Sequence, residues 1–135
     1  MKLKGKLIRE KESGYSISVE SIGAFTQGET KEEALKMIKE AIELMINQID
    51  FQIQITSLSG NTFYIEGNKP CILFALWLRQ NRIKQGLTLE DMRKKMGAKS
   101  KNEYAKYEKG KNQPSLEKIE KLIKAVKPKA NLLLI

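Results

Sequence analysis

The strongest constraint on the fold is a change in the spacing of apolar residues near the middle of the chain. Before residue 70, apolar and polar residues alternate in short runs, as in Tyr15-Ser16-Ile17-Ser18-Val19. This period of two is typical of strands with one buried face. After residue 70, apolar residues recur at helical spacing in segments that end at glycine or proline. The 135 residues therefore predict an α+β chain of two small domains, residues 1–69 and 70–135.

The first domain is predicted to be a small antiparallel sheet with one packed helix. Strands are expected at residues 2–9, 15–20 and 24–27. Thr30 and Glu33 have the spacing of a capping box, so a helix should begin there. An apolar stripe at helical spacing follows and should cover one face of the sheet: Ala34, Ile38, Ala41, Ile42, Met45 and Ile49.

A second hairpin should complete this domain. Residues 51–56 and 63–65 alternate like strands, and Ser59-Gly60-Asn61 between them favours a turn. Residues 67–70 form a linker, and Pro70 suits the first turn of a helix.

The second domain is predicted to be all helical. The stops at Gly86, Gly97, Gly110 and Pro128 divide it into four helices, at residues 73–85, 88–96, 100–108 and 115–126. The tail after residue 130, Asn131-Leu-Leu-Leu-Ile135, is apolar enough that we expect it to add a strand or to pack against a second subunit.

The charge is divided unevenly between the two domains. Residues 1–69 carry nine Lys and Arg against ten Asp and Glu, a net charge of −1. Residues 70–135 carry sixteen against six, a net charge of +10, and the two domains together give the total of +9. This division favours a polyanionic partner for the second domain. A lysine-rich solvated surface is the alternative reading.

Several function classes are excluded or disfavoured by composition. The chain contains no histidine, which removes Ser-His-Asp and Cys-His nucleophile systems and metal sites that use histidine. Its single cysteine, Cys71, cannot form an internal disulfide. The longest apolar run, residues 71–78, is too short to span a bilayer, and the N-terminus does not read as a secretory signal. We expect a cytoplasmic protein that is not an enzyme, with no cofactor, metal or membrane.

The second domain resembles the Xre/Cro-type helix-turn-helix family over about residues 74–126. The residues that carry this resemblance are Leu78-Arg79, Gly86-Leu87-Thr88, Met96-Gly97, Tyr104, Tyr107-Glu108-Lys109-Gly110-Lys111 and Pro114-Ser115-Leu116. The resemblance implies that residues 100–108 form the helix that enters the major groove of operator DNA.

Positions on and beside that helix are the candidate DNA contacts. The positions that match the family's base-reading residues are Ser100, Lys101, Asn102, Glu103 and Lys106. The flanking positions that would hold phosphates are Lys99, Lys109, Lys111 and Asn112. Tyr104 and Tyr107, three positions apart, suggest a stacking platform for single-stranded nucleic acid, but they match core positions of the family, so the resemblance implies a role in the core.

Two residues depart from the family pattern. Leu89 stands where a phosphate-binding glutamine is usual, and Arg93 replaces a small residue that lets two helices approach closely. The segment from Ala98 to Lys109 is also one residue longer than the common pattern.

The first domain resembles HicB-type antitoxins over about residues 1–50. The matching residues are Gly14-Tyr15-Ser16-Ile17, then Thr26-Gln27-Gly28-Glu29-Thr30-Lys31-Glu32-Glu33-Ala34, then Glu40-Ala41-Ile42-Glu43-Leu44. The resemblance implies a truncated ribonuclease H-like fold. It also implies an antitoxin that binds a HicA-type mRNA-cleaving toxin and represses its own operon as a homodimer or higher oligomer. It assigns no toxin-contact residue, although Glu29, Glu32, Glu33, Glu40 and Glu43 could steer a basic partner.

Two other functions remain open from the sequence. One is a stand-alone transcription regulator whose first domain senses a small molecule. The other is a carboxylate-dependent nuclease that the helix-turn-helix directs to DNA.

Overall fold

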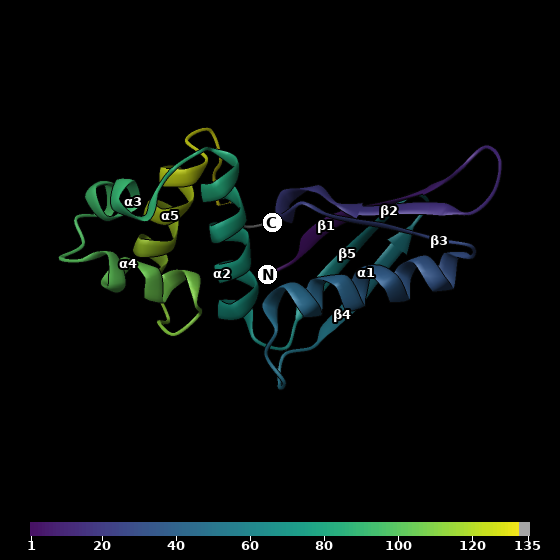
Figure 1. Cartoon of the computed structure of the whole chain (residues 1–135), viewed down its shortest axis with the longest axis horizontal. Helices are drawn as coiled ribbons and strands as arrows, with labels where there is room; N and C mark the ends of the chain where they lie inside the picture. The colour runs from purple at the N-terminus through teal and green to yellow at the C-terminus, as the bar shows by residue number, and fades with distance from the viewer. Residues whose placement is uncertain (133–135) are drawn as a thin grey trace. The chain divides into compact units, whose positions relative to one another are not determined.

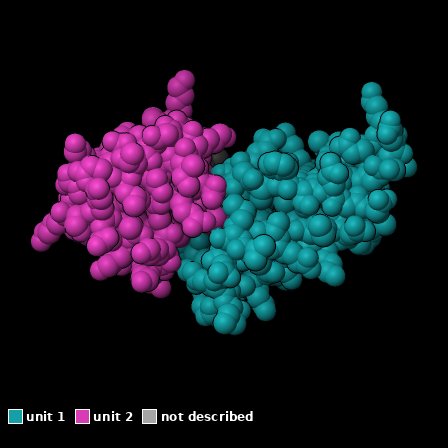
Figure 2. All heavy atoms as spheres, viewed as in Figure 1, with its two compact units in different colours: residues 1–73 teal, residues 74–135 magenta. Residues whose placement is uncertain are grey.

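The chain forms two compact units in the computed structural model, which describes residues 1–132 except for the side chain of Ser57. Unit 1 is Met1–Leu73 and unit 2 is Phe74–Ile135 (Figure 2). The division lies four residues after the boundary expected between Lys69 and Pro70. It falls inside helix α2, Pro70–Lys84, because the first turn of that helix belongs to unit 1.

Unit 1 is a five-stranded antiparallel sheet with one helix along it, which confirms the predicted fold class (Figure 1). The spatial order of the strands is β3-β2-β1-β5-β4, so the second hairpin joins the sheet beside β1. The elements are β1 Leu3–Arg9, β2 Tyr15–Val19, the short 3-10 helix η1 Glu20–Ile22, β3 Ala24–Gly28, α1 Lys31–Ile46, β4 Ile53–Ser59 and β5 Thr62–Gly67.

Helix α1 begins where the sequence predicts and ends earlier than expected. The Thr30 hydroxyl accepts a hydrogen bond from the Glu33 amide at 3.1 Å and caps the helix. At the other end, Asn47 takes a left-handed conformation with φ 52° and closes the helix after Ile46. Ile49 is therefore fully exposed, and its assignment to the buried stripe is wrong.

The core of unit 1 lies between α1 and the sheet. Fully buried side chains come from the inward face of α1 and from the central strands: Ile17, Val19, Ile38, Ile42, Phe63 and Ile65. Burial at alternate positions confirms the period of two that the sequence shows.

Unit 2 contains the four predicted helices. They are the part of α2 from Phe74 onward, α3 Leu89–Met96, α4 Lys101–Glu108 and α5 Leu116–Val126. Helix α2 begins at Pro70 rather than Leu73. The helices enclose a core of Phe74, Leu78, Met92, Met96, Tyr104, Leu122 and Val126.

The aromatic residues of unit 2 belong to this core. Tyr104 is fully buried and Tyr107 packs against the cluster, so the core interpretation of the two tyrosines is confirmed. Trp77 stacks on Phe74 with ring centroids 6.0 Å apart. Of the apolar tail, Asn131 and Leu132 are exposed, and the expected packing of residues 133–135 concerns positions outside the described part of the chain.

Candidate nucleic-acid interface

Helices α3 and α4 are joined by a tight turn, residues 97–100. Gly97 takes a left-handed conformation with φ 67°, and its amide donates to carbonyls of the last turn of α3. A side chain at this backbone angle would be strained, which explains the glycine. Ser100 then caps α4, because its hydroxyl accepts from the Glu103 amide at 3.1 Å. The turn therefore fixes the direction of α4 relative to α3.

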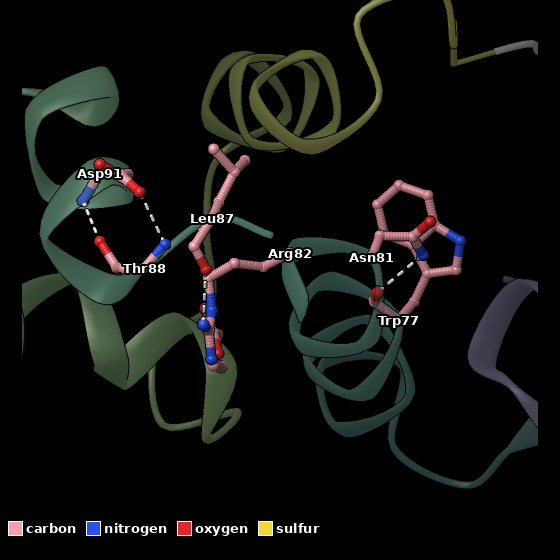
Figure 3. Close-up of polar contacts among 7 residues, drawn as sticks. Trp77, Asn81, Arg82, Leu87, Thr88 and Asp91 are labelled. Carbon is pink, nitrogen blue, oxygen red and sulfur yellow. Dashed lines mark hydrogen bonds and ion pairs between the residues drawn. The ribbon is translucent and has the colours of Figure 1, made fainter. Parts of the chain in front are cut away.

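The start of α3 is held by a reciprocal pair of hydrogen bonds (Figure 3). The Thr88 hydroxyl accepts from the Asp91 amide at 3.0 Å, and the Asp91 carboxylate accepts from the Thr88 amide at 2.8 Å. The hydrogen bonds from Thr88 hold the pKa of Asp91 below its usual range. The carboxylate also places negative charge at the positive end of the helix dipole.

An ion pair between α2 and α4 fixes the other end of α4. Arg82 Nε lies 2.7 Å from Glu108 Oε2, and both side chains are largely buried. Arg82 also donates through Nη1 to the Leu87 carbonyl at 3.0 Å (Figure 3). Beside this pair, burial together with the Glu108 carboxylate raises the pKa of Tyr104 above its usual range. Helix α4 is thus held by a buried tyrosine, a buried ion pair and its own cap.

Arg93, one of the two residues that depart from the family pattern, joins α3 to the turn. Its Nε and Nη2 contact Glu90 Oε1 at 2.8 and 2.6 Å, and its Nη1 donates to the Ala98 carbonyl at 3.2 Å. The hydrogen bond from Arg93 lowers the pKa of Glu90. Leu89, the other departure, is half-buried and packs against the core of unit 2, as an apolar side chain is expected to do.

The candidate DNA contacts lie on α4 and on the two segments that flank it. All of them are exposed except Asn112, which is half-buried: Lys99, Ser100, Lys101, Asn102, Glu103, Lys106, Lys109 and Lys111. The structure thus gathers them around one short helix.

The side chains of two of these candidates stabilise the first turn of α4. The Ser100 hydroxyl caps α4, and the Glu103 carboxylate accepts from the Lys99 amide at 2.8 Å. The side chains of Lys101, Asn102 and Lys106 are exposed and take no part in the N-terminal cap. An Asn amide can pair with adenine, and a Lys amine can donate to guanine or phosphate. These three side chains are therefore free of a capping role, and their contact with bases stays a prediction.

Sequence reasoning missed two features of this interface. Lys94 and Lys95 are exposed on the last turn of α3, and the basic run that contains them was a visible signal. The pairing of Arg82 with Glu108 had no local signal, because the two residues are 26 positions apart.

Within residues 1–132, no three acidic or cysteine side chains come together as they would to hold a metal ion. No helix in the same range is long and apolar enough to cross a membrane.

Comparison with known proteins agrees with this geometry. Residues 78–127 match the Helix-turn-helix domain family, which spans most of unit 2. No curated protein matches the chain. Residues 78–127 are therefore an Xre/Cro-type helix-turn-helix domain, which indicates sequence-specific binding of double-stranded DNA and a role in transcription regulation.

Proposed function

We propose that this protein is an antitoxin that neutralises a HicA-type mRNA-cleaving toxin through unit 1 and represses its own operon through unit 2. In this proposal the chain binds its partners and catalyses no reaction. The observation that carries the toxin-binding half is an acidic and apolar stripe on the exposed side of α1, described below.

The motif that resembles HicB antitoxins forms the corner between β3 and α1. A Cβ atom on Gly28 would lie 2.5 Å from the Ala34 backbone nitrogen, so this position requires a glycine. Thr30 caps the helix that follows, and Ala34 is fully buried beneath it. The motif residues Gly28, Thr30 and Ala34 therefore all stabilise the corner between β3 and α1, which supports a common fold with that family.

The exposed side of α1 carries the stripe, which we call the α1 ridge: Glu33, Met37, Glu40 and Leu44. Residues at this spacing share one face of a helix. All four are exposed, and Leu44 is 75% exposed. Met37 lies between the two carboxylates and Leu44 lies one turn beyond them. Exposed apolar side chains beside carboxylates suit a basic protein partner, because the apolar groups bury area and the carboxylates steer the approach.

Glu43 does not belong to this ridge. Its carboxylate accepts a hydrogen bond from the Ile53 amide at 2.9 Å and so ties α1 to β4. It holds the fold of unit 1 together and is not available to a partner in the way that the sequence suggests.

Charge reversal tests the toxin-binding half. Glu40→Lys combined with Leu44→Ala should abolish the rescue of cells that express the cognate toxin, while repression of the operon persists. Glu20→Lys is the matched control, because it makes the same charge change at an exposed position of unit 1 outside the ridge. It should leave rescue intact.

The DNA-binding half of the proposal is tested by variants of unit 2, which should have the opposite effects. Lys101→Ala with Asn102→Ala should abolish repression and leave rescue intact. Rescue that survives the ridge variant would show that another surface of the chain binds the toxin. Absence of rescue by the unmodified chain, together with repression that needs a small molecule and no toxin gene, would favour a stand-alone ligand-sensing regulator instead.

A further inference from the structure

The sheet of unit 1 has a second face that α1 does not cover (Figure 1). Along β1, Leu3, Gly5 and Leu7 are buried, whereas Lys4, Lys6 and Ile8 alternate with them and are exposed. Together with outward residues of the neighbouring strands, they form what we call the sheet platform: Lys4, Lys6, Ile8, Ser16, Ser18, Phe25, Gln27 and Tyr64.

Strand pairing places these side chains in rows. Lys6 is opposite Ser18, and Ser18 is opposite Phe25, so an amine, a hydroxyl and an aromatic ring stand in one row across three strands. In a parallel row, Lys4 on β1 is opposite Tyr64 on β5. Side chains directly opposite each other in neighbouring strands are about 5 Å apart, so each row forms a continuous surface.

The platform is hollowed beside Phe25. A shallow depression of about 570 Å³ is lined by residues that include Lys6, Ile8, Ser18, Phe25 and Gln27. The Phe25 ring at its rim is 79% exposed. The exposed face of this ring is flat and apolar, so stacking of another ring on it would remove apolar surface from water.

The charge of the platform is positive at its centre. Lys4 and Lys6 lie on the central strand of the sheet, while the carboxylates on the same face, Glu10 and Glu66, lie at or near the ends of their strands. Glu10 there accepts from the Ser16 hydroxyl at 2.6 Å, and Glu66 lies on β5 opposite Gln54. The lysines of the sheet platform contrast with the carboxylates of the α1 ridge, so the two faces of unit 1 suit partners of opposite charge.

We propose that the sheet platform binds single-stranded RNA, with Phe25 stacked on a base and with Lys4 and Lys6 against phosphates. Unpaired bases present a free face for stacking, which a duplex does not. The Ser18 hydroxyl and the Gln27 amide, between the ring and the lysines, suit 2′-hydroxyl groups. A basic toxin would be repelled by the lysines, so this activity is separate from the toxin binding proposed for the α1 ridge.

The test uses the full chain and a labelled twelve-nucleotide RNA without secondary structure, followed by fluorescence anisotropy. Phe25→Leu should weaken RNA binding at least fivefold, the lower end of what a lost base stack costs, whereas Phe25→Tyr should retain affinity. Lys4→Gln with Lys6→Gln should reduce the slope of log K against log salt by about 1.4, since each neutralised phosphate of a single strand contributes about 0.7.

The control must account for the basic unit 2, which also attracts nucleic acid. Lys31→Gln with Lys36→Gln makes the same charge change on α1 and should alter RNA affinity less than twofold. All platform variants should bind operator duplex as the unmodified chain does, and circular dichroism melting should show that they are folded.

Several outcomes would overturn the proposal. Equal losses in the platform and control variants would show that binding is only electrostatic. Equal affinity for DNA of the same sequence would remove the assignment to RNA. If Phe25→Leu leaves RNA affinity unchanged and Phe25→Ala abolishes self-association in sedimentation, the platform is a contact between copies of this chain.

Discussion

Arg82 and Glu108 form a short ion pair, 2.7 Å from Nε to Oε2, that joins helix α2 to the end of helix α4. The two side chains are 14% and 6% exposed, so the pair is shielded from solvent and salt. Because Arg82 also donates to the Leu87 carbonyl, one side chain holds both the end of α4 and the loop that precedes α3. The placement of α4, the helix that carries the candidate DNA contacts, thus depends on a contact with another helix.

Removing the arginine alone should strongly destabilise unit 2. Arg82→Met leaves the Glu108 carboxylate buried without its partner, and breaking a buried pair in this way costs about 3–5 kcal/mol. Urea unfolding followed by the fluorescence of Trp77 measures the change, because Trp77 is the single tryptophan and packs in unit 2. The double variant Arg82→Met with Glu108→Leu should recover part of the loss. A cost below about 1 kcal/mol for the single variant would contradict the assigned role of the pair.

Base contacts and phosphate contacts should separate in DNA-binding assays. Asn102→Ala or Lys101→Ala should weaken binding to the operator by about 1–3 kcal/mol and affect unrelated duplexes much less. Lys111→Ala should weaken all sequences alike and reduce the salt slope by about 0.9. Titrations at several salt concentrations distinguish these results. Uniform losses in all three variants would show that α4 does not read bases.

The cap of α4 should matter more for DNA binding than an equivalent cap elsewhere. Ser100 and Ser115 both accept a hydrogen bond from the amide three residues later, at 3.1 and 3.2 Å. Replacing either by Ala should cost about 1 kcal/mol of stability. Ser100→Ala should in addition lower operator affinity, because it loosens the first turn of α4, where Lys101 and Asn102 lie. Thermal melting and operator titration of both variants test this, and equal operator affinities would show that the cap serves stability alone.

Below pH 8, stability should depend on pH only in the acid range. The pKa values of Glu90 and Asp91 are lowered by Arg93 and by Thr88 respectively. A carboxyl whose pKa is lower in the folded chain stabilises it above the unfolded value and loses that effect as pH falls through the folded value. Because the ordinary values are 4.5 and 3.8 and the chain has no histidine, melting temperature should be nearly constant from pH 5 to 8 and fall below about pH 4. Asp91→Asn should make this decline shallower, and a loss of stability between pH 5 and 7 would contradict the assignment.

The protein should act on DNA as a dimer or a higher oligomer. One helix-turn-helix domain buries too little surface for tight operator binding, so two should occupy half-sites about one helical turn apart. Sedimentation at micromolar concentration and footprinting of the operator measure this directly. A monomer that protects a single half-site would refute it.

Local chemistry explains which parts of the fold were predictable. The caps at Thr30, Thr88, Ser100 and Ser115 each depend on residues three positions apart, so the helix starts could be predicted from sequence. The end of α3 at Gly97 was also predictable, because it depends on the left-handed backbone conformation of that single glycine. The end of α1 was missed because Asn47 takes a left-handed conformation, which an asparagine adopts only in some contexts.

The helix that carries the candidate DNA contacts was predicted from the sequence, and the contacts themselves stay a prediction. Their position on α4 followed from the helix-turn-helix pattern, and the exposure of Lys101, Asn102 and Lys106 agrees with it. Only their hydrogen bonds in the structure show that Ser100 and Glu103 stabilise the start of the helix. The bridge from Arg93 to the Ala98 carbonyl likewise shows how an arginine fits where the family has a small residue.

The sequence by itself determined the two-part α+β organisation, the helix-turn-helix pattern and the concentration of positive charge after residue 70. These depend on periodicity, capping and composition, which act between near neighbours. Only the tertiary structure decided that β5 lies between β1 and β4, that Arg82 meets Glu108, and that unit 1 has an acidic ridge and a basic sheet face. The reason is physical: strand pairing and buried ion pairs join residues far apart in the chain, and their free energy depends on burial that no local pattern encodes.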